Sequence, residues 1–476
     1  MNSHLEKWNK LLELKDSLYQ FDFENRNYLI DTNSCNFCEI DLNAKQLVSQ
    51  ITKGTSFNKM KEGCSDLFSY DSLVEVLDEL FMLYSNGFLV SQNKVSTINE
   101  LKDQPVSTLC LIMATDCNLR CRYCFAKGGS YNLTRKKMSS YVAETSVDFL
   151  LANSWRKKSL SLSFFGGEPL LNLDVIKRTV RYAKKMGKKH KKKFSFNITT
   201  NGTILNQDIM DFLVKNDFGI IISLDGPKEV NDKQRVFPNG SGTYELVANN
   251  LEKFVKRYPK MRHKITIRGT ITIKTKDISK SLYHLKKLGF SIMSLETVMT
   301  QNTEFEINDE NISKIFREYN KVAKRYLESL KTGDNFSFFH LHQMFFQVSE
   351  GTQRISQCGA GVGYLSIDPE GEIYPCHRFV GDSRFVMGTV FHNEVDPKIK
   401  DVFRHSSVNN KEDCKNCWAK YICGGGCHAT AIQFNDDILK PHKIECELMK
   451  HRIKLGTWIY SQLNEAPRQK SIEINQ

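Results

Sequence analysis

The sequence predicts an α/β protein of six strand–helix units, for which a closed or partly open barrel fits better than a flat sheet, with one small module before it and one after it. Three observations lead to this prediction. Strand-like and helix-like segments alternate strictly between residues 106 and 331. Residues 1–100 lack this alternation and are predicted to form a winged-helix-like module. Residues 335–462 form a cysteine-rich region, and 463–476 form a polar tail.

The N-terminal module shows mixed elements in a short span. A strand is expected at 27–31, helices at 42–51 and 71–82, and a closing strand at 87–90. The polar segment 96–105 is the expected linker. Three cysteines fall in this module, and packed or free thiols are favoured over a metal site for them. They are Cys35, Cys38 and Cys64.

The central region contains six strand–helix units in a row, which imply parallel strands joined by right-handed crossovers. Chemistry in such barrels collects in the loops that follow the strands. The expected strands are 109–114, 160–165, 194–199, 219–224, 265–273 and 291–298. The expected helices lie near 139–152, 173–189, 206–216, 243–258, 277–288 and 309–331.

Composition narrows the class of protein. The hydrophobic share is 40%, and neither an eighteen-residue apolar run nor a signal-peptide core occurs, so we expect a cytoplasmic chain without a membrane role. Fourteen cysteines in a reducing compartment indicate metal chemistry rather than disulfides. The net charge of +13 favours an acidic partner. The basic run 184–193 is interpreted as the solvated end of a helix.

The loop after the first strand carries Cys117, Cys121 and Cys124, with three and then two residues between them. Iron–sulfur clusters of the [4Fe–4S] type are held by cysteine thiolates. Three thiolates leave one iron open to a small molecule. Three unrelated thiols are one alternative; a zinc knuckle is the other, but it would require a fourth ligand nearby.

The next three strands also end in unusual loops. These are Gly166-Gly167-Glu168-Pro169, Thr199-Thr200-Asn201-Gly202 and Ser223-Leu224-Asp225-Gly226-Pro227, the last followed by 231–235. Each would be an ordinary turn if it stood alone. Their repetition at strand ends, in register with the cysteine loop, indicates one common site.

The third region holds seven cysteines, which match neither one four-cysteine zinc site nor two such sites. They match two iron–sulfur clusters with four and three thiolates, and a zinc ribbon over 414–427 is the alternative. A hairpin turn is expected at 368–371. The cysteines are Cys358, Cys376, Cys414, Cys417, Cys423, Cys427 and Cys446.

These ordered motifs resemble the radical S-adenosylmethionine (radical SAM) enzymes, and the C-terminal cysteines resemble their SPASM extension. The resemblance implies a partial (β/α)6 TIM barrel as the radical SAM domain over 105–332, a SPASM domain over 335–462 and three [4Fe–4S] clusters. The first cluster, on Cys117, Cys121 and Cys124, would bind S-adenosylmethionine and cleave it to a 5′-deoxyadenosyl radical. The implied cofactor-binding residues are Tyr123, Gly166, Gly167, Glu168, Ser223 and Arg235.

The resemblance also implies the ligands of two auxiliary clusters. One would use Cys414, Cys417, Cys423 and Cys446; the other would use Cys358, Cys376 and Cys427. Relatives that mature sulfatases have a further cysteine shortly after the first of these, and an Asp after the second. This chain has no cysteine in 359–365 and has His377 in place of the Asp. Both departures argue against sulfatase maturation.

A three-thiolate auxiliary cluster resembles that of maturases which install thioether cross-links in ribosomally made, cysteine-containing precursor peptides. We therefore expect such an enzyme, with the N-terminal module recognising the leader of the peptide and a flavodoxin or ferredoxin as electron donor. A sulfatase-maturating enzyme and a carbon–carbon peptide cyclase are the alternative enzymes. A zinc-stabilised RNA-binding protein is the alternative from another class, although nucleic acid is not the expected partner.

Overall fold

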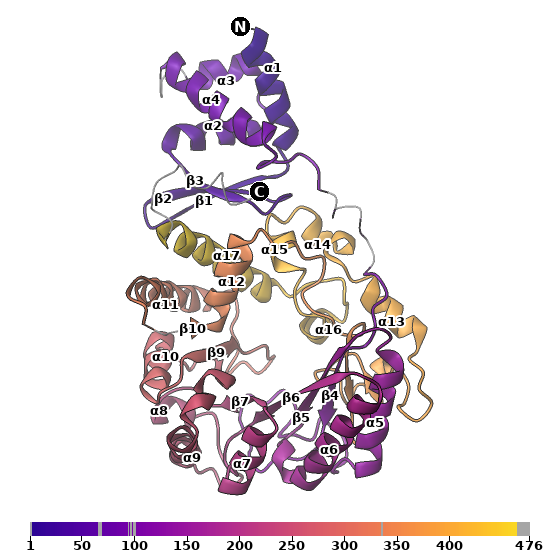
Figure 1. The fold of residues 1–476 in the computed structure, drawn as a ribbon. Helices are drawn as coiled ribbons and strands as arrows, with labels where there is room; N and C mark the ends of the chain where they lie inside the picture. Colours follow the sequence, from indigo (N-terminus) through magenta and orange to yellow (C-terminus); the bar gives the residue numbers. More distant parts are fainter. Residues whose placement is uncertain are drawn as a thin grey trace.

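The computed structural model describes residues 2–64, 69–93, 95, 98, 101–334 and 337–463. The predicted tail lies almost wholly outside these residues, as do several positions of the predicted linker and the side chain of Cys64. Figure 1 shows the N-terminal module at one end, the large sheet with its helices at the other, and the C-terminal segments between them.

The N-terminal module begins with a helix, continues with a three-stranded antiparallel sheet in the order β1-β2-β3, and ends with three helices. Trp8, Leu47 and Leu77 are fully buried at the centre of its core. The elements are α1 (Asn2–Leu11), β1 (Leu18–Phe23), β2 (Arg26–Asp31), β3 (Phe37–Ile40), α2 (Leu42–Thr52), α3 (Phe57–Cys64) and α4 (Tyr70–Ser85).

The predicted strand and both predicted helices of this module are confirmed, but the closing strand at 87–90 is wrong. Side chains occupy the backbone groups that a ladder would need. The Val90 N–H donates to Asp31 at 2.8 Å, and the Phe88 carbonyl accepts from Ser34 and Asn36. The sheet is completed by β1 and β3, which come earlier in the chain.

Asp31 is the side chain that fastens residues 88–90 to the sheet. Its buried carboxylate accepts from Val90 N, Asn33 N and Ser34 Oγ. We expect Asp31→Ala to destabilise the module by at least about 1.5–3 kcal/mol, because donors to a buried charge lose their acceptor. Urea denaturation and proteolysis at 88–93 measure this. Asp22→Ala, which removes only an exposed ion pair with Lys45, is the control, and equal effects of the two variants would contradict the prediction.

Six parallel strands form the centre of the large sheet, and all six predicted strands and all six predicted helices of this region are confirmed. Ser139, Asn206 and Asp277 cap their helices by accepting a backbone N–H three residues ahead. The strands are β4 (Thr108–Ile112), β5 (Ser159–Phe165), β6 (Lys193–Thr200), β7 (Gly219–Ser223), β8 (Ile265–Ile271) and β9 (Ile292–Thr297). The helices are α5 (Ser140–Asn153), α6 (Leu173–Lys189), α7 (Gln207–Lys215), α8 (Lys228–Asn231), α9 (Tyr244–Arg257), α10 (Ile278–Lys287) and α11 (Ile312–Thr332).

The two faces of this sheet differ in polarity. Residues that face the helices, such as Leu162, Ile198 and Ile267, are fully or almost fully buried. Residues of the opposite, inner face are less buried and include polar ones, such as the half-buried Ser163 and the exposed Arg268. This alternation predicts an inner surface that a polar substrate can reach.

The sheet extends beyond the six predicted strands at both ends, in the order β10-β9-β8-β7-β6-β5-β4-β11-β12. β11 lies parallel to β4, with Leu365 opposite Leu109, and forms the predicted hairpin with β12. The cysteine-rich region therefore shares its sheet with the barrel, which the sequence did not indicate. The added strands are β10 (Ser337–Phe338), β11 (Tyr364–Ile367) and β12 (Ile373–Tyr374).

The C-terminal helices join all parts of the molecule (Figure 1). The N-terminal sheet packs on α17: Tyr28 Oη lies 2.9 Å from Ser461 Oγ, and Phe37 packs edge-on against Tyr460. Tyr19 stacks on Trp418 with ring centroids 4.2 Å apart. The helices are α12 (Phe339–Ser349), α13 (Pro397–Arg404), α14 (Glu412–Lys415), α15 (Lys420–Cys423), α16 (His428–Asn435) and α17 (Lys443–Leu463). Short 3-10 helices are Leu12–Leu14, Pro169–Asn172, Pro259–Lys264, Ser383–Phe385 and Val408–Asn410.

Candidate active site and cluster centres

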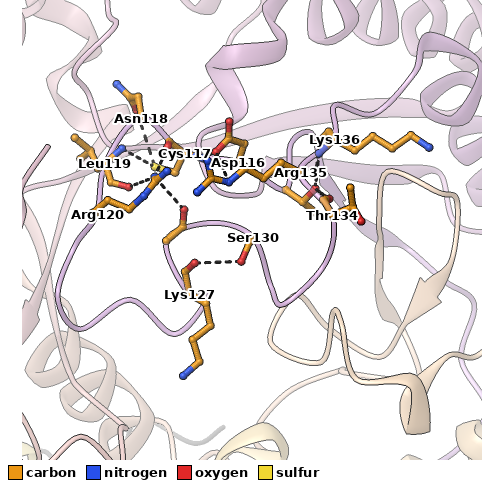
Figure 2. Close-up of polar contacts among 12 residues, drawn as sticks. Asp116, Cys117, Asn118, Leu119, Arg120, Lys127, Ser130, Thr134, Arg135 and Lys136 are labelled. Atoms are coloured by element: carbon orange, nitrogen blue, oxygen red, sulfur yellow. Dashed lines mark hydrogen bonds and ion pairs between the residues drawn. The ribbon is translucent and has the colours of Figure 1, made fainter. Parts of the chain in front are cut away.

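The loop after β4 is held in a compact form by its own side chains (Figure 2). Arg120 donates to the carbonyl oxygens of Cys117 and Leu119 at 2.6 and 2.7 Å. The Cys117 N–H donates to Asp116 Oδ1 at 2.9 Å, and Asp116 also pairs with Arg135. The three predicted cysteines of this loop are only partly buried. Burial raises the pKa of the Cys117 thiol to about 12, and the nearby Cys121 adds to the rise.

Gly166 and Gly167 are required by the backbone of this loop. The N–H groups of Gly167 and Glu168 donate to Ala114 O and Asp116 O, both at 2.9 Å. A Cβ on Gly167 would lie 2.1 Å from Asp116 O, and one on Gly166 would lie 2.6 Å from Ala114 O. At these atoms the two glycines therefore allow the Gly-Gly loop to approach the backbone of the cysteine loop.

Glu168 links the Gly-Gly loop to the end of β6. Its carboxylate is fully buried and accepts from Thr200 Oγ1 and Asn201 N, each at 2.7 Å. Burial raises the pKa of Glu168 to about 7 despite these bonds. Asn201 in turn donates from Nδ2 toward Cys117 Sγ at 3.7 Å. The loops after β4, β5 and β6 thus form one connected polar network.

A second buried network joins Tyr123, Asp225 and Arg235. The Tyr123 hydroxyl donates to Asp225 at 2.8 Å and accepts from Arg235 Nη1 at 2.7 Å. The Asp225 side chain is fully buried and that of Arg235 is 9% exposed, so Arg235 and Asp225 do not form a surface ion pair. Burial works against the charge of Arg235, but Tyr123, Cys121 and Asp225 hold the pKa of its guanidinium well above the usual value. Ser223, also predicted, ends β7 and is half-buried.

The four cysteines predicted to share one auxiliary cluster lie near one another. Burial raises the pKa of Cys414 to about 12, and the Cys423 and Cys417 thiols add to this rise. The same three thiols raise the pKa of Cys446, which burial already elevates. Lys411 is buried beside this group, and its Nζ donates to Gly425 O at 2.7 Å.

The three remaining cysteines form a second group. Burial raises the pKa of Cys376 to about 12, and the Cys427 and Cys358 thiols raise it further. Cys358 is exposed as a residue, yet its sulfur is enclosed enough that desolvation raises the pKa of its thiol. Arg378 donates from Nη1 to Cys427 Sγ at 3.4 Å. The structure thus brings together the same sets of thiols that the resemblance implied.

His377 links the second thiol group to the inner surface of the barrel. Its ring lies 4.8 Å from that of Phe165 and 6.0 Å from that of Phe125, measured between centroids. Its Nδ1 is 3.1 Å from Tyr364 Oη. Burial, followed by Arg268 and Arg378, lowers the pKa of His377 to about 3, so the imidazole is neutral at physiological pH.

Sequence reasoning missed several polar residues of this inner surface. Glu296 accepts from Ser294 Oγ at 2.7 Å and lies 2.9 Å from His340 Nε2, while Arg268 lies 3.9 Å away. Asp225 was noted only as part of a turn. A strand that alternates polar residues toward one face was the available signal for Arg268 and Glu296.

The residues present fit iron–sulfur clusters and S-adenosylmethionine. Buried, mutually close thiols become thiolates on binding iron. Cys117, Cys121 and Cys124 would hold the first cluster, and the networks of Glu168 and Arg235 would border its cofactor. Among the described residues, no three His, Cys, Asp or Glu side chains converge closely enough to ligate a single metal ion.

The fold and these centres define an enzyme that performs radical chemistry on a parallel barrel. Residues 111–282 match the model of the radical SAM superfamily, and residues 358–418 match the SPASM iron–sulfur cluster-binding domain. The chain therefore contains a radical SAM domain and a SPASM domain, and it is an enzyme.

Curated relatives span most of the chain. A cysteine-type anaerobic sulfatase-maturating enzyme of Clostridium novyi is 26% identical over 329 residues, 66% of this chain and 85% of the relative. The radical SAM cyclopropyl synthase TigE of Paramaledivibacter caminithermalis is 23% identical over 449 residues, 88% of this chain and 89% of the relative.

Solved structures confirm the predicted fold class. The chain resembles native anSMEcpe with bound AdoMet and Kp18Cys peptide at a TM-score of 0.64 and 21% identity, over 75% of this chain and 99% of the other. It resembles SuiB of Streptococcus suis, bound to the precursor peptide SuiA, at 0.50 and 17%, over 90% and 98%. In the part of the chain that the structure describes, no helix is long and apolar enough to cross a membrane.

Proposed function

We propose that this enzyme installs thioether cross-links in a ribosomally made, cysteine-containing peptide. The observation that carries the proposal is the group of Cys358, Cys376 and Cys427, which is one thiol short of a fully ligated four-iron cluster. A peptide cysteine can supply the missing donor. None of residues 359–365 is a cysteine, and the hydroxyl of Tyr364 in this stretch lies next to His377.

The reaction balances without an external oxidant. A C–S bond forms, while one C–H bond and one S–H bond of the peptide break. S-adenosylmethionine supplies the hydrogen-abstracting radical and ends as methionine and 5′-deoxyadenosine, which keeps the abstracted hydrogen. The thiol hydrogen leaves as a proton, and the electron that starts the cycle returns to the clusters. A flavodoxin or ferredoxin would provide the first electron.

The chain's own residues would orient the peptide between the cysteine loop and the second thiol group. His377 lies beside Phe125 of the cysteine loop and Phe165 of β5, so it faces both centres. The neutral ring of His377 and its apolar neighbours would exclude water from the space between the cysteine loop and the second thiol group. Arg268 and Glu296 on the inner surface offer charged contacts to peptide side chains.

The N-terminal module supports recognition of a leader segment. In the described part of the chain, no strand pairs with the outer edge of β1 or of β3. An open edge can accept an extended peptide as an added strand. The sheet is fixed to α17, which carries Cys446 of the four-thiol group, so a bound leader would be tethered close to the cluster domain.

A second candidate is formation of a cyclopropyl ring, favoured by the similarity to TigE over 88% of the chain. Ring closure between two carbons also removes two hydrogens from the substrate. It leaves every cysteine thiol of the peptide free, which makes the two candidates distinguishable.

The test uses purified, iron-reconstituted enzyme with S-adenosylmethionine, dithionite and short cysteine-containing peptides encoded beside its gene. We expect a product two hydrogens lighter per turnover, with one fewer thiol open to alkylation by iodoacetamide for each cross-link. The same peptide with Ser in place of each Cys is the control and should yield 5′-deoxyadenosine without a lighter product. A lighter product that keeps all its thiols would overturn the thioether proposal in favour of a carbon–carbon bond, and the absence of any lighter product would overturn both.

A further inference from the structure

Glu445 has an environment that the protein alone does not explain. It lies in the first turn of α17, directly before Cys446. Its Oε1 accepts from the Cys427 N–H at 3.1 Å, while its Oε2 is buried and has no hydrogen-bond partner among the described residues. Burying a carboxylate oxygen without a partner is unfavourable unless something else binds it.

A capping role accounts for only half of this side chain. Cys427 is the N-cap of α16, so an acceptor for its N–H is useful there. One oxygen provides that bond, and a purely structural carboxylate would turn the other toward water or a cation. Three cations act on Glu445, and each donates to other acceptors. Lys411 donates to Gly425 O, Arg378 donates to Cys427 Sγ, Thr430 and Gln433, and Arg452 donates to Thr297 and Tyr319.

The carboxylate lies between the two auxiliary thiol groups. Glu445 directly precedes Cys446 of the four-thiol group in the chain, and its Oε1 binds the backbone N–H of Cys427 of the three-thiol group. Its free oxygen is also close to Gly426, since a Cβ there would lie 3.6 Å from Oε2. Glu445 is therefore within the cluster domain rather than on its surface.

We propose that Glu445 Oε2 ligates the fourth iron of the cluster on Cys358, Cys376 and Cys427 when no substrate is bound. This inference rests on the cluster assignment of the proposed function. The four-thiol group has one donor for each of its irons, so only the three-thiol group has an iron to offer. Tyr364, which follows Cys358 by six residues, directs its hydroxyl to His377.

A thiolate can replace the Glu445 carboxylate at this iron. Iron in sulfur clusters prefers soft thiolates over carboxylate oxygens. A peptide thiolate can thus displace Glu445, exchanging one anionic donor for another without changing the charge on the cluster. Glu445 would protect the open iron until a substrate cysteine arrives.

The test probes the iron directly with ¹³C-cyanide, in holoenzyme whose first cluster is saturated with S-adenosylmethionine. Pulsed electron paramagnetic resonance of the reduced enzyme reports ¹³C coupling when cyanide binds. In Glu445→Gln, which keeps the acceptor for Cys427 N–H, we expect half-saturation at a cyanide concentration at least about tenfold lower than in the wild type. The reason is that Glu445 occupies the iron in the wild type, so a smaller fraction of the sites is free to bind cyanide.

Gln357→Leu is the matched control, because Gln357 precedes Cys358 and its Oε1 is also buried without a partner. It should bind cyanide as the wild type does. Iron content and thermal melting verify that all variants are loaded and folded. Equal cyanide binding by wild type and Glu445→Gln, or a gain only in Gln357→Leu, would overturn the proposal. This readout needs no peptide, so it can succeed or fail independently of thioether formation.

Discussion

Gly167→Ala is expected to abolish the first cluster. The added Cβ would lie 2.1 Å from Asp116 O and 3.0 Å from Cys117 N, and both contacts are with backbone atoms. Either the Gly-Gly loop or the cysteine loop must move, and a displacement of about 1 Å at a reacting centre costs on the order of 100-fold in rate. We expect 5′-deoxyadenosine formation to fall by at least that factor.

Iron analysis should show the structural origin of this loss. A chain with three clusters holds on the order of twelve irons, and the variant should retain about eight. Gly63→Ala on α3 is the matched control, because its Cβ would meet only Gln50 Nε2 at 3.8 Å. Full iron content together with normal 5′-deoxyadenosine formation in Gly167→Ala would show that the loop tolerates the displacement.

Arg235→Leu is expected to destabilise the barrel by about 3–5 kcal/mol, because it leaves a buried carboxylate without its cation. The Asp225 side chain is fully buried, and Arg235 Nη1 lies 3.9 Å from Oδ1. The hydroxyl of Tyr123 would remain as a donor to Asp225, but it carries no charge to offset the carboxylate. Urea denaturation monitored by circular dichroism measures the change.

Arg178→Leu is the control for this prediction. Arg178 also pairs with a carboxylate through two nitrogens, but the pair with Glu144 lies on the surface. Exposed pairs are screened by water, so we expect no measurable change in the unfolding midpoint. If both arginine variants unfold alike, burial of the Asp225 pair is not what stabilises the loops after β4 and β7.

Local pattern was sufficient to predict the central fold. Apolar periodicity predicts the strands β4 to β9 and the helices between them. Capping residues such as Ser139 and Asp277 mark where helices begin. The basic run at 184–193 is, as predicted, the exposed end of α6. The prediction of a strand at 87–90 was wrong because it rested on an apolar run alone. In the structure, the side chains of Asp31 and Asn36 bind the backbone of this segment.

The grouping of the cysteines in the first loop could also be predicted, because the spacing of ligands within one loop is a local property. Cys117, Cys121 and Cys124 lie within eight residues and come together whatever the rest of the chain does. Cys35 and Cys38 show the limit of such spacing. Cys35 joins the main core and Cys38 packs against the N-terminal one, as expected for packed thiols.

The sequence by itself determined the six strand–helix units, the cysteine loop and the class of chemistry. Only the tertiary structure decided that β11 pairs with β4, that Asp225 joins Tyr123, and that Glu445 reaches Cys427 with one oxygen to spare. The physical reason is distance along the chain. Periodicity and spacing report interactions among neighbouring residues, whereas these contacts join distant segments whose approach depends on the packing of the whole protein.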